Sequence, residues 1–218
     1  MSMLEPRVKP LLRGVSHEIA AFLFAPFSFA LVAGARGATA VAGAAVYAVS
    51  VFSLFAISAF YHRPMWRPAA RDLLGRIDHS AIFVLIAGTY TPFCLLLGAG
   101  AGTALLVGIW VGAALGVAMS IGWPGAPKWL VALVCVLLGW QVLPLAPRLG
   151  GVLGQGTLAL VVAGGLLYTA GALVYALRRP DPFPRVFGFH EIFHLFVVGA
   201  AACHFLAVRT AVGVLGAG

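Results

Sequence analysis

Charged residues are scarce in this sequence. Asp, Glu, Lys and Arg make up only 9% of its 218 residues, whereas hydrophobic residues make up 62% and the mean hydropathy is +1.03. A soluble fold of this length could not bury so much apolar surface, so a water-soluble globular protein is excluded. The chain also lacks internal repeats, low-complexity tracts and linkers, which predicts a single domain over residues 1–218.

Cysteine is nearly absent as well. Cys94, Cys135 and Cys203 stand alone in apolar stretches, where a cysteine usually serves as a small core residue. No disulfide framework and no CxxC metal motif is therefore expected.

Long apolar runs are what the sequence has in abundance. A helix needs about 20 mostly apolar residues to cross a bilayer, where it satisfies its own backbone hydrogen bonds. We predict an all-α membrane protein, a bundle of seven transmembrane helices joined by short loops such as GARGA and RLGGVLGQG. The predicted spans are 17–35, 39–61, 77–97, 103–121, 128–145, 155–177 and 187–211.

The basic residues fall mainly on one side of these spans. One side has Arg7, Lys9, Arg13, Arg63, Arg67, Arg71, Arg76, Lys128, Arg178, Arg179 and Arg185. The other has only Arg36, Arg148 and Arg209. Because positive flanks stay in the cytoplasm, we predict a cytoplasmic N-terminus and a C-terminus outside, which requires an odd number of spans. The net charge of +8 thus reflects topology, and no nucleic-acid partner is expected.

The first apolar run has an alternative interpretation. Basic residues precede it and Ala33-Gly34-Ala35 follows, as at the end of a cleavable signal peptide. Glu18 and Pro26 within the run argue against cleavage.

Ionisable residues inside membrane helices are costly, so each is a candidate for function. In the predicted topology the second helix ends in SAFYH at the cytoplasmic face, which places Ser58 and His62 there. The third helix starts at the same face with RIDHS, which places Asp78 in its first turn. The seventh starts there with FHEIFH, which supplies His190 and His194. Three distant segments therefore deliver polar groups to one depth.

The spacing of the histidines indicates a metal site. His190 and His194 are four residues apart and share a helix face, an arrangement that holds zinc through imidazole nitrogens. With His62 they form a three-histidine set that leaves a fourth position for water, as in catalytic zinc sites. Copper and iron also accept imidazole, so zinc is the preferred metal and not the sole one.

Neighbouring polar residues receive weaker assignments. Asp78 suits a base that takes a proton from water, and Ser58 suits a hydrogen-bond donor to a carbonyl oxygen. His79 is expected to face a neighbouring helix or the membrane interface, and Glu191 to be solvated or to face lipid headgroups. His17 and Glu18 are either a cap of the first helix or part of the site. His204 lies about 15 Å deeper than His194 and is excluded as a ligand of the same ion.

The motifs SAFYH, RIDHSAIFVLIAGTYTPF and HEIFHLFVVGAAACHFLAV resemble the bacterial hemolysin III proteins, relatives of the progestin and adiponectin receptors and, more distantly, of the alkaline ceramidases. The resemblance covers nearly the whole chain. It implies seven helices, a cytoplasmic N-terminus, zinc on His62, His190 and His194, and functional matches at Asp78 and Ser58. The first helix departs from the pattern, because HEIAAFLFAPF keeps Glu18 but lacks the polar residues that usually follow.

Three functions remain open. The favoured one is a zinc-dependent hydrolase in the bacterial inner membrane that cleaves a ceramide-like lipid amide or ester with a zinc-bound water. A sensor of membrane state with structural zinc is the second. A pore-forming hemolysin is the third, and it has the least support because polar residues do not continue through the outer half of the membrane. The partner expected in the first two is a membrane lipid.

Overall fold

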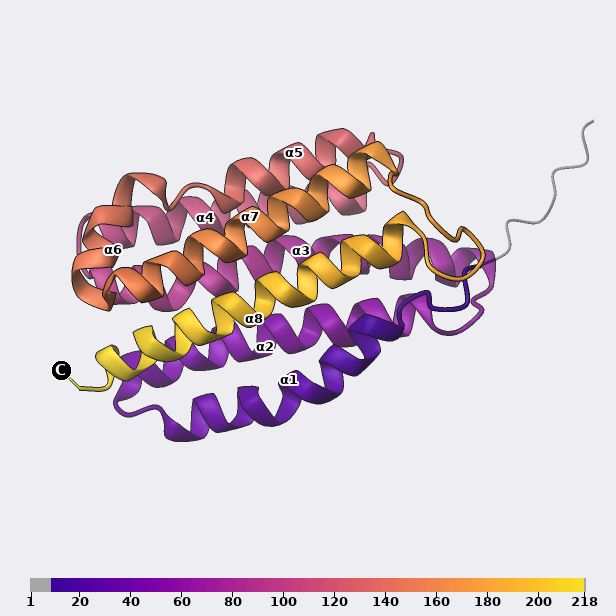
Figure 1. Cartoon of the computed structure of the whole chain (residues 1–218). Coiled ribbons are helices and arrows are strands. Elements are labelled where there is room, and N and C mark those ends of the chain that lie inside the picture. The colour runs from indigo at the N-terminus through magenta and orange to yellow at the C-terminus, as the bar shows by residue number, and fades with distance from the viewer. Residues whose placement is uncertain (1–8, 218) are drawn as a thin grey trace, which may run out of the picture.

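The computed structural model describes residues 9–217 as a bundle of long helices (Figure 1). The elements are α1 (Val15–Gly34), α2 (Ala38–His62), α3 (Pro68–Leu97), α4 (Ala101–Gly122), α5 (Lys128–Gly139), the 3-10 turn η1 (Leu143–Leu145), α6 (Ala146–Leu153), α7 (Gln155–Leu177) and α8 (Phe189–Leu215). In the bundle α8 contacts α1, α2 and α3 on one side and α7 on the other.

Seven helical segments among residues 9–217 are long and apolar enough to cross a membrane. Six of them are single helices. The remaining one, fifth in chain order, runs from Lys128 to Leu153 and comprises α5, η1 and α6. The prediction of an all-helical bundle with seven spans is therefore confirmed. The start of α1 and the C-terminus lie at opposite ends of the bundle (Figure 1), as an odd number of spans requires.

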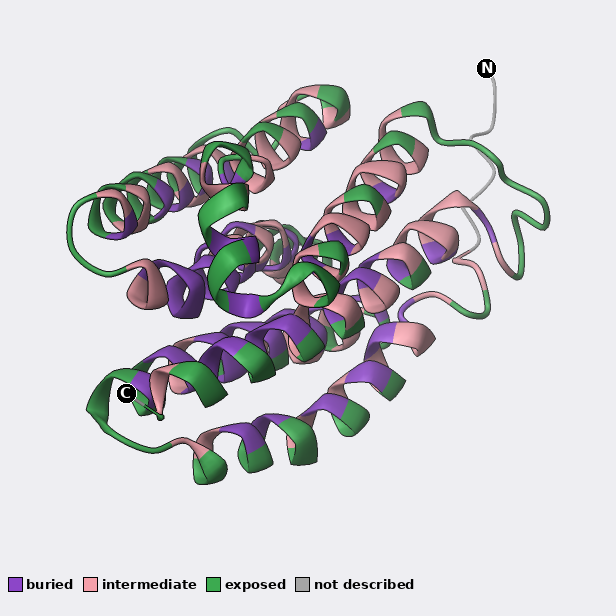
Figure 2. Ribbon diagram, turned by 60° about the vertical axis from the view of Figure 1, so that its left-hand side comes forward, coloured by how far each residue is buried: buried purple, intermediate pink, exposed green. Residues whose placement is uncertain are grey.

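The outward surface of the bundle is apolar. On α1, the side chains of Phe22, Phe27 and Phe29 are exposed, whereas His17, Ala20 and Phe24 on the opposite face are buried. Figure 2 shows the same division, with buried residues turned inward and exposed residues outward. Lipid is the solvent that suits such an outer face, because water would leave these large aromatic surfaces unfavourably hydrated.

The third helix begins earlier than predicted. It starts at Pro68 and not near residue 77, so Asp78 lies about 15 Å from its first residue and not in its first turn. Pro68 occupies the first turn of the helix, where its missing N–H costs nothing. The added turns carry Arg71 and Arg76. Such a polar extension lies outside an apolar run and cannot be found from hydropathy.

The fifth predicted span is broken. The first part, α5, ends at Gly139, and the expected loop RLGGVLGQG is largely the helix α6. Pro144 and Pro147 lie in η1 and the first turn of α6, where each starts a new helical segment.

A tyrosine fixes this break. The hydroxyl of Tyr90 on α3 donates a hydrogen bond to the carbonyl of Gly139 (2.6 Å) and accepts one from the N–H of Val142 (2.9 Å). Two backbone groups released by the break are thereby satisfied inside the bundle, as the membrane interior demands.

Helices α3 and α4 pack closely at a glycine. A β-carbon on Gly116 would overlap Cδ1 of Phe83, whose side chain is fully buried. The overlap involves Cγ, Cδ1 and Cε1 of a fully buried ring and not the end of a flexible side chain, so this position favours glycine.

We expect Gly116→Ala to destabilise the fold by about 1–3 kcal/mol, because an added methyl group overpacks this contact. The measurement is the melting temperature of the purified protein in detergent. Gly108→Ala is the matched control on the same helix, since nothing lies within 4 Å of the position that its β-carbon would take. Equal melting temperatures for the two variants would contradict the packing argument.

Candidate functional site

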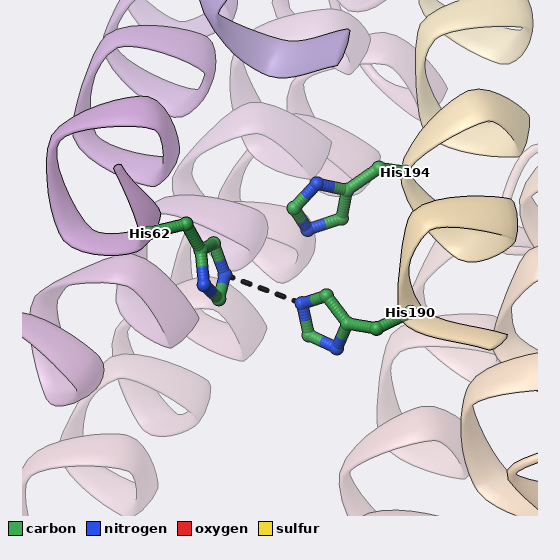
Figure 3. Close-up of side chains that lie close together, drawn as sticks. All are labelled: His62, His190 and His194. Carbon is green, nitrogen blue, oxygen red and sulfur yellow. Dashed lines mark hydrogen bonds between the residues drawn. The ribbon is translucent and has the colours of Figure 1, made fainter. Parts of the chain in front are cut away.

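Three histidines from two helices converge at one end of the bundle. His62 is the last residue of α2, and His190 and His194 lie in the first two turns of α8. Their rings turn toward one another (Figure 3), and the Nε2 atoms of His62 and His190 are 3.2 Å apart. One ligand atom from each of the three lies within 4.8 Å of the others. The predicted histidine cluster is therefore assembled.

The spacing suits a metal ion. Two nitrogens bound about 2.0–2.1 Å from a tetrahedral ion lie about 3.3 Å apart, close to the separation of His62 and His190. The ring of His194 stands within the same cluster and completes three imidazole donors. This group could hold a metal ion, and its donors do not by themselves identify zinc.

Asp78 and Ser58 lie beside the cluster, as predicted. A carboxylate oxygen (Oδ2) of Asp78 is 3.7 Å from Nε2 of His62, and the side chain is nearly buried. Ser58 lies one turn before His62 on α2 and is also buried. The structure thus gathers α2, α3 and α8 at one depth, which is the arrangement expected from the topology.

The first helix contributes His17. The Nδ1 atom of His17 lies 2.8 Å from the hydroxyl of Ser58, and its ring stacks on that of His194 with centroids 3.8 Å apart and planes at 6°. His17 is therefore part of the site and not a solvent-exposed cap of α1. No sequence motif links His17 to Ser58. The only indication that His17 belongs to the site was its position at the start of an apolar run.

Glu18 has a different environment. Its carboxylate pairs with Arg63 at 2.7 Å, and both side chains are about 40% exposed. It therefore links α1 to the end of α2 on the surface, and only His17 brings α1 into the site.

Two further histidines lie outside the cluster. The Nε2 atom of His79 is 3.3 Å from the hydroxyl of Tyr175 on α7, so this residue faces a neighbouring helix as expected. His204 lies deeper in α8, with Nε2 3.1 Å from the carbonyl oxygen of Val161.

The interpretation of Glu191 as a solvated acid was wrong. Its side chain is only 3% exposed, and Oε1 pairs with Nε of Arg13 at 2.5 Å. The other oxygen, Oε2, accepts a hydrogen bond from the N–H of Gly188 (2.8 Å) and so caps the start of α8. A glutamate three residues after the N-cap is half of a capping box, but the N-cap is Gly188 and not the Ser or Thr that would make the signature recognisable in the sequence.

The segment before α1 lies across the histidine end of the bundle. The N–H of Leu11 donates to the carbonyl of Arg185 in the loop before α8, and the ammonium of Lys9 donates to the carbonyl of Arg63 at 2.6 Å. Burial, and then the charge of nearby arginines, lowers the pKa of Lys9. Three arginines, Arg13, Arg63 and Arg71, therefore lie near the ammonium of Lys9 at this end of the bundle.

A cavity of about 140 Å³ runs inward from the cluster. Its polar end is lined by His17, Ser58, Asp78, His190 and His194. Beyond that end, apolar residues of α3, α5, α7 and α8 form most of the wall. Along α8 the lining extends from His190 to His204, about 21 Å. The cavity is thus long and narrow, with its densest group of ionisable side chains at one end.

Comparison with known proteins identifies the family. The model of the haemolysin-III related family matches residues 6–205. This chain belongs to the haemolysin III family. It is 35% identical to Hemolysin-3 of Bacillus cereus over 199 residues, which cover 89% of this chain and 87% of that protein. It is 33% identical to the Hemolysin-3 homolog of Bacillus subtilis (strain 168) over 201 residues, 89% and 90% of the two chains.

A shorter match reaches beyond the bacterial haemolysin III proteins. A stretch of 58 residues is 41% identical to the adiponectin receptor protein of Drosophila melanogaster, covering 24% of this chain and 13% of that protein. This match fits the wider superfamily to which the sequence motifs pointed. With the seven membrane-spanning helices, the bacterial haemolysin III relatives identify a multi-pass protein of a bacterial membrane.

The ion pair of Arg13 and Glu191 is open to test. We expect Arg13→Gln to lower stability by about 2–3 kcal/mol, because it leaves a buried carboxylate without its cation. Thermal unfolding in detergent measures the effect, and adding Glu191→Gln should restore much of the loss. Arg63→Gln is the control: its pair with Glu18 is exposed and should contribute at most about 1 kcal/mol. An Arg13→Gln variant as stable as this control would contradict the assignment.

Proposed function

We propose that this haemolysin III protein is a metal-dependent hydrolase that cleaves an amide or ester of a membrane lipid, with ceramide-like lipids as the substrate class. The observation that carries the proposal is the cavity: a cluster of histidines, an aspartate and a serine lies at one end of an apolar channel inside a membrane bundle. That layout suits a substrate with one reactive polar group and a long apolar tail.

His62, His190 and His194 would hold the ion, and zinc is the metal that three imidazoles and an open fourth position suit best. When bound, such an ion polarises a carbonyl group and lowers the pKa of water toward about 7. The stacking of His17 on His194 holds one ligand ring in place from the side of α1.

Asp78 and Ser58 would perform the proton chemistry. Asp78 lies beside His62 and can accept the proton of an attacking water molecule. When His17 donates its Nδ1 proton to the oxygen of Ser58, the serine hydroxyl can donate to Asp78 or, once a substrate is bound, to the developing oxyanion. Water then adds to the carbonyl carbon, the bond to nitrogen or oxygen breaks, and Asp78 returns the proton to the leaving nitrogen or oxygen. The products are a fatty acid and an amine or alcohol.

The apolar part of the cavity would bind the acyl tail. Its walls include Ile82, Leu85 and Ile86 of α3 and Val131 and Val136 of α5. Packing of the tail against these walls provides binding energy, and it places the carbonyl at the polar end. A lipid substrate reaches the channel from the bilayer, so no aqueous entrance is needed for the tail.

A metal that only clamps the helices together is the competing function. It receives support from the same cluster, because His62 belongs to α2 while His190 and His194 belong to α8. A pore is not favoured, because the wall of the cavity is mainly apolar beyond the polar end, whereas a conducting path needs polar groups along its length.

Metal binding gives the first test of the proposal. We expect purified protein to contain one zinc ion per chain by elemental analysis, and His62→Ala, His190→Ala or His194→Ala to reduce its occupancy at least tenfold. His204→Ala, on the same helix but outside the cluster, should retain full occupancy. Full zinc content in all three cluster variants would refute the assignment of the ligands.

Activity gives the second test. We expect Asp78→Asn to keep its metal and to release fatty acid from a ceramide panel about 10²–10⁴ times more slowly than wild type, as for loss of a general base. Asp181→Asn is the control, since its carboxylate lies in the loop before α8, where it accepts a hydrogen bond from the N–H of Phe189. If the wild-type protein with full metal releases no fatty acid from any lipid of the panel, the hydrolase function is wrong and the clamp is favoured.

A further inference from the structure

The deep end of the cavity has a second pair of polar side chains. His204 of α8 and Tyr168 of α7 both line the cavity, and their ring centroids are 5.5 Å apart. His204 follows His194 by ten residues on one helix, so this pair lies about 15 Å from the histidine cluster. Polar groups at such a depth are costly unless they have partners.

The hydrogen bond of His204 fixes which of its nitrogens is free. Nε2 lies 3.1 Å from the carbonyl oxygen of Val161, which can only accept, so Nε2 has the proton and donates it. A charged ring would be costly at this depth, and the neutral ring leaves Nδ1 as an acceptor. That Nδ1 atom is buried and has no hydrogen-bond partner among the described residues.

The hydroxyl of Tyr168 also lacks a hydrogen-bond partner in the described part of the chain, and it too is buried. The nearby polar groups are already paired: Nε1 of Trp140 donates to the hydroxyl of Thr169, which donates to the carbonyl of Gly165. An unmade hydrogen bond at a buried donor or acceptor costs about 1–3 kcal/mol, so two such groups on one cavity wall indicate a missing ligand group.

We propose that His204 and Tyr168 form a binding site for a hydroxyl group on a long apolar chain. A hydroxyl suits both unpaired atoms, because it can donate its proton to Nδ1 of His204 and accept one from the hydroxyl of Tyr168. A plain alkyl chain would leave both atoms unpaired. The ligand class is a fatty chain hydroxylated far from its carbonyl group. This distance rests on the proposed function, which places the carbonyl at the histidine cluster.

Binding of matched fatty acids tests the site. Full-length protein in lipid nanodiscs is titrated with a plain fatty acid and with hydroxylated isomers of the same length, their hydroxyl moved stepwise toward the tail end. We expect one isomer with its hydroxyl far from the carboxylate to bind about five- to tenfold more tightly than the plain chain. Tyr168→Phe and His204→Phe should each remove that preference while keeping affinity for the plain chain.

Tyr47→Phe is the matched control. Tyr47 is a fully buried tyrosine of α2 that does not line the cavity, so its loss should leave the preference for the hydroxylated chain unchanged. Melting temperatures establish whether each variant is folded. If His204→Phe is not folded, Tyr168→Phe alone decides the outcome.

Several results would overturn the hydroxyl site. The first is equal affinity of the wild type for plain and hydroxylated chains, which would mean that water alone occupies the pair. The second is no binding of either chain. The third is an unchanged preference for the hydroxylated chain in Tyr168→Phe. The same titration on His194→Ala separates this site from the hydrolase. A hydroxyl preference that persists in a protein without hydrolytic activity supports the site and leaves the hydrolase to be judged on its own tests.

Discussion

The interior of a bilayer offers no water, so a polar side chain there is costly unless it has a partner. This constraint explains why several polar residues of the spans are paired with one another or with the backbone. Ser58 meets His17, Asp78 lies against His62, and the hydroxyl of Tyr90 satisfies two backbone groups at the break after α5.

The same constraint made much of the fold predictable. Apolar runs long enough to cross the membrane indicated the seven spans, and alternating their direction was enough to predict that His62, Asp78 and the pair on α8 share one depth. Topology of this kind needs only helix lengths and loop order. The prediction that the N-terminus is cytoplasmic rests on the distribution of arginines and stays a prediction.

What escaped prediction depends on local chemistry or on helix packing. The early start of α3 lies in a polar stretch that hydropathy does not register, and the division of the fifth span follows from prolines inside an apolar run. The stacking of His17 on His194 depends on how α1 rotates against α8, which no spacing in the sequence encodes. Glu191 was predicted to be solvated or to face lipid headgroups, whereas its contacts with Arg13 and with the N–H of Gly188 bury it.

The break after α5 has a consequence for the dimensions of the channel. Twelve residues of helix rise about 18 Å, well short of the roughly 30 Å of hydrocarbon that a full span crosses. Gly139 and Trp140, at the end of this short helix, line the cavity near its deep end, where the indole of Trp140 is fixed to Thr169. The early end of α5 thus sets where Gly139 and Trp140 stand in the cavity wall, and with them the shape of its deep end.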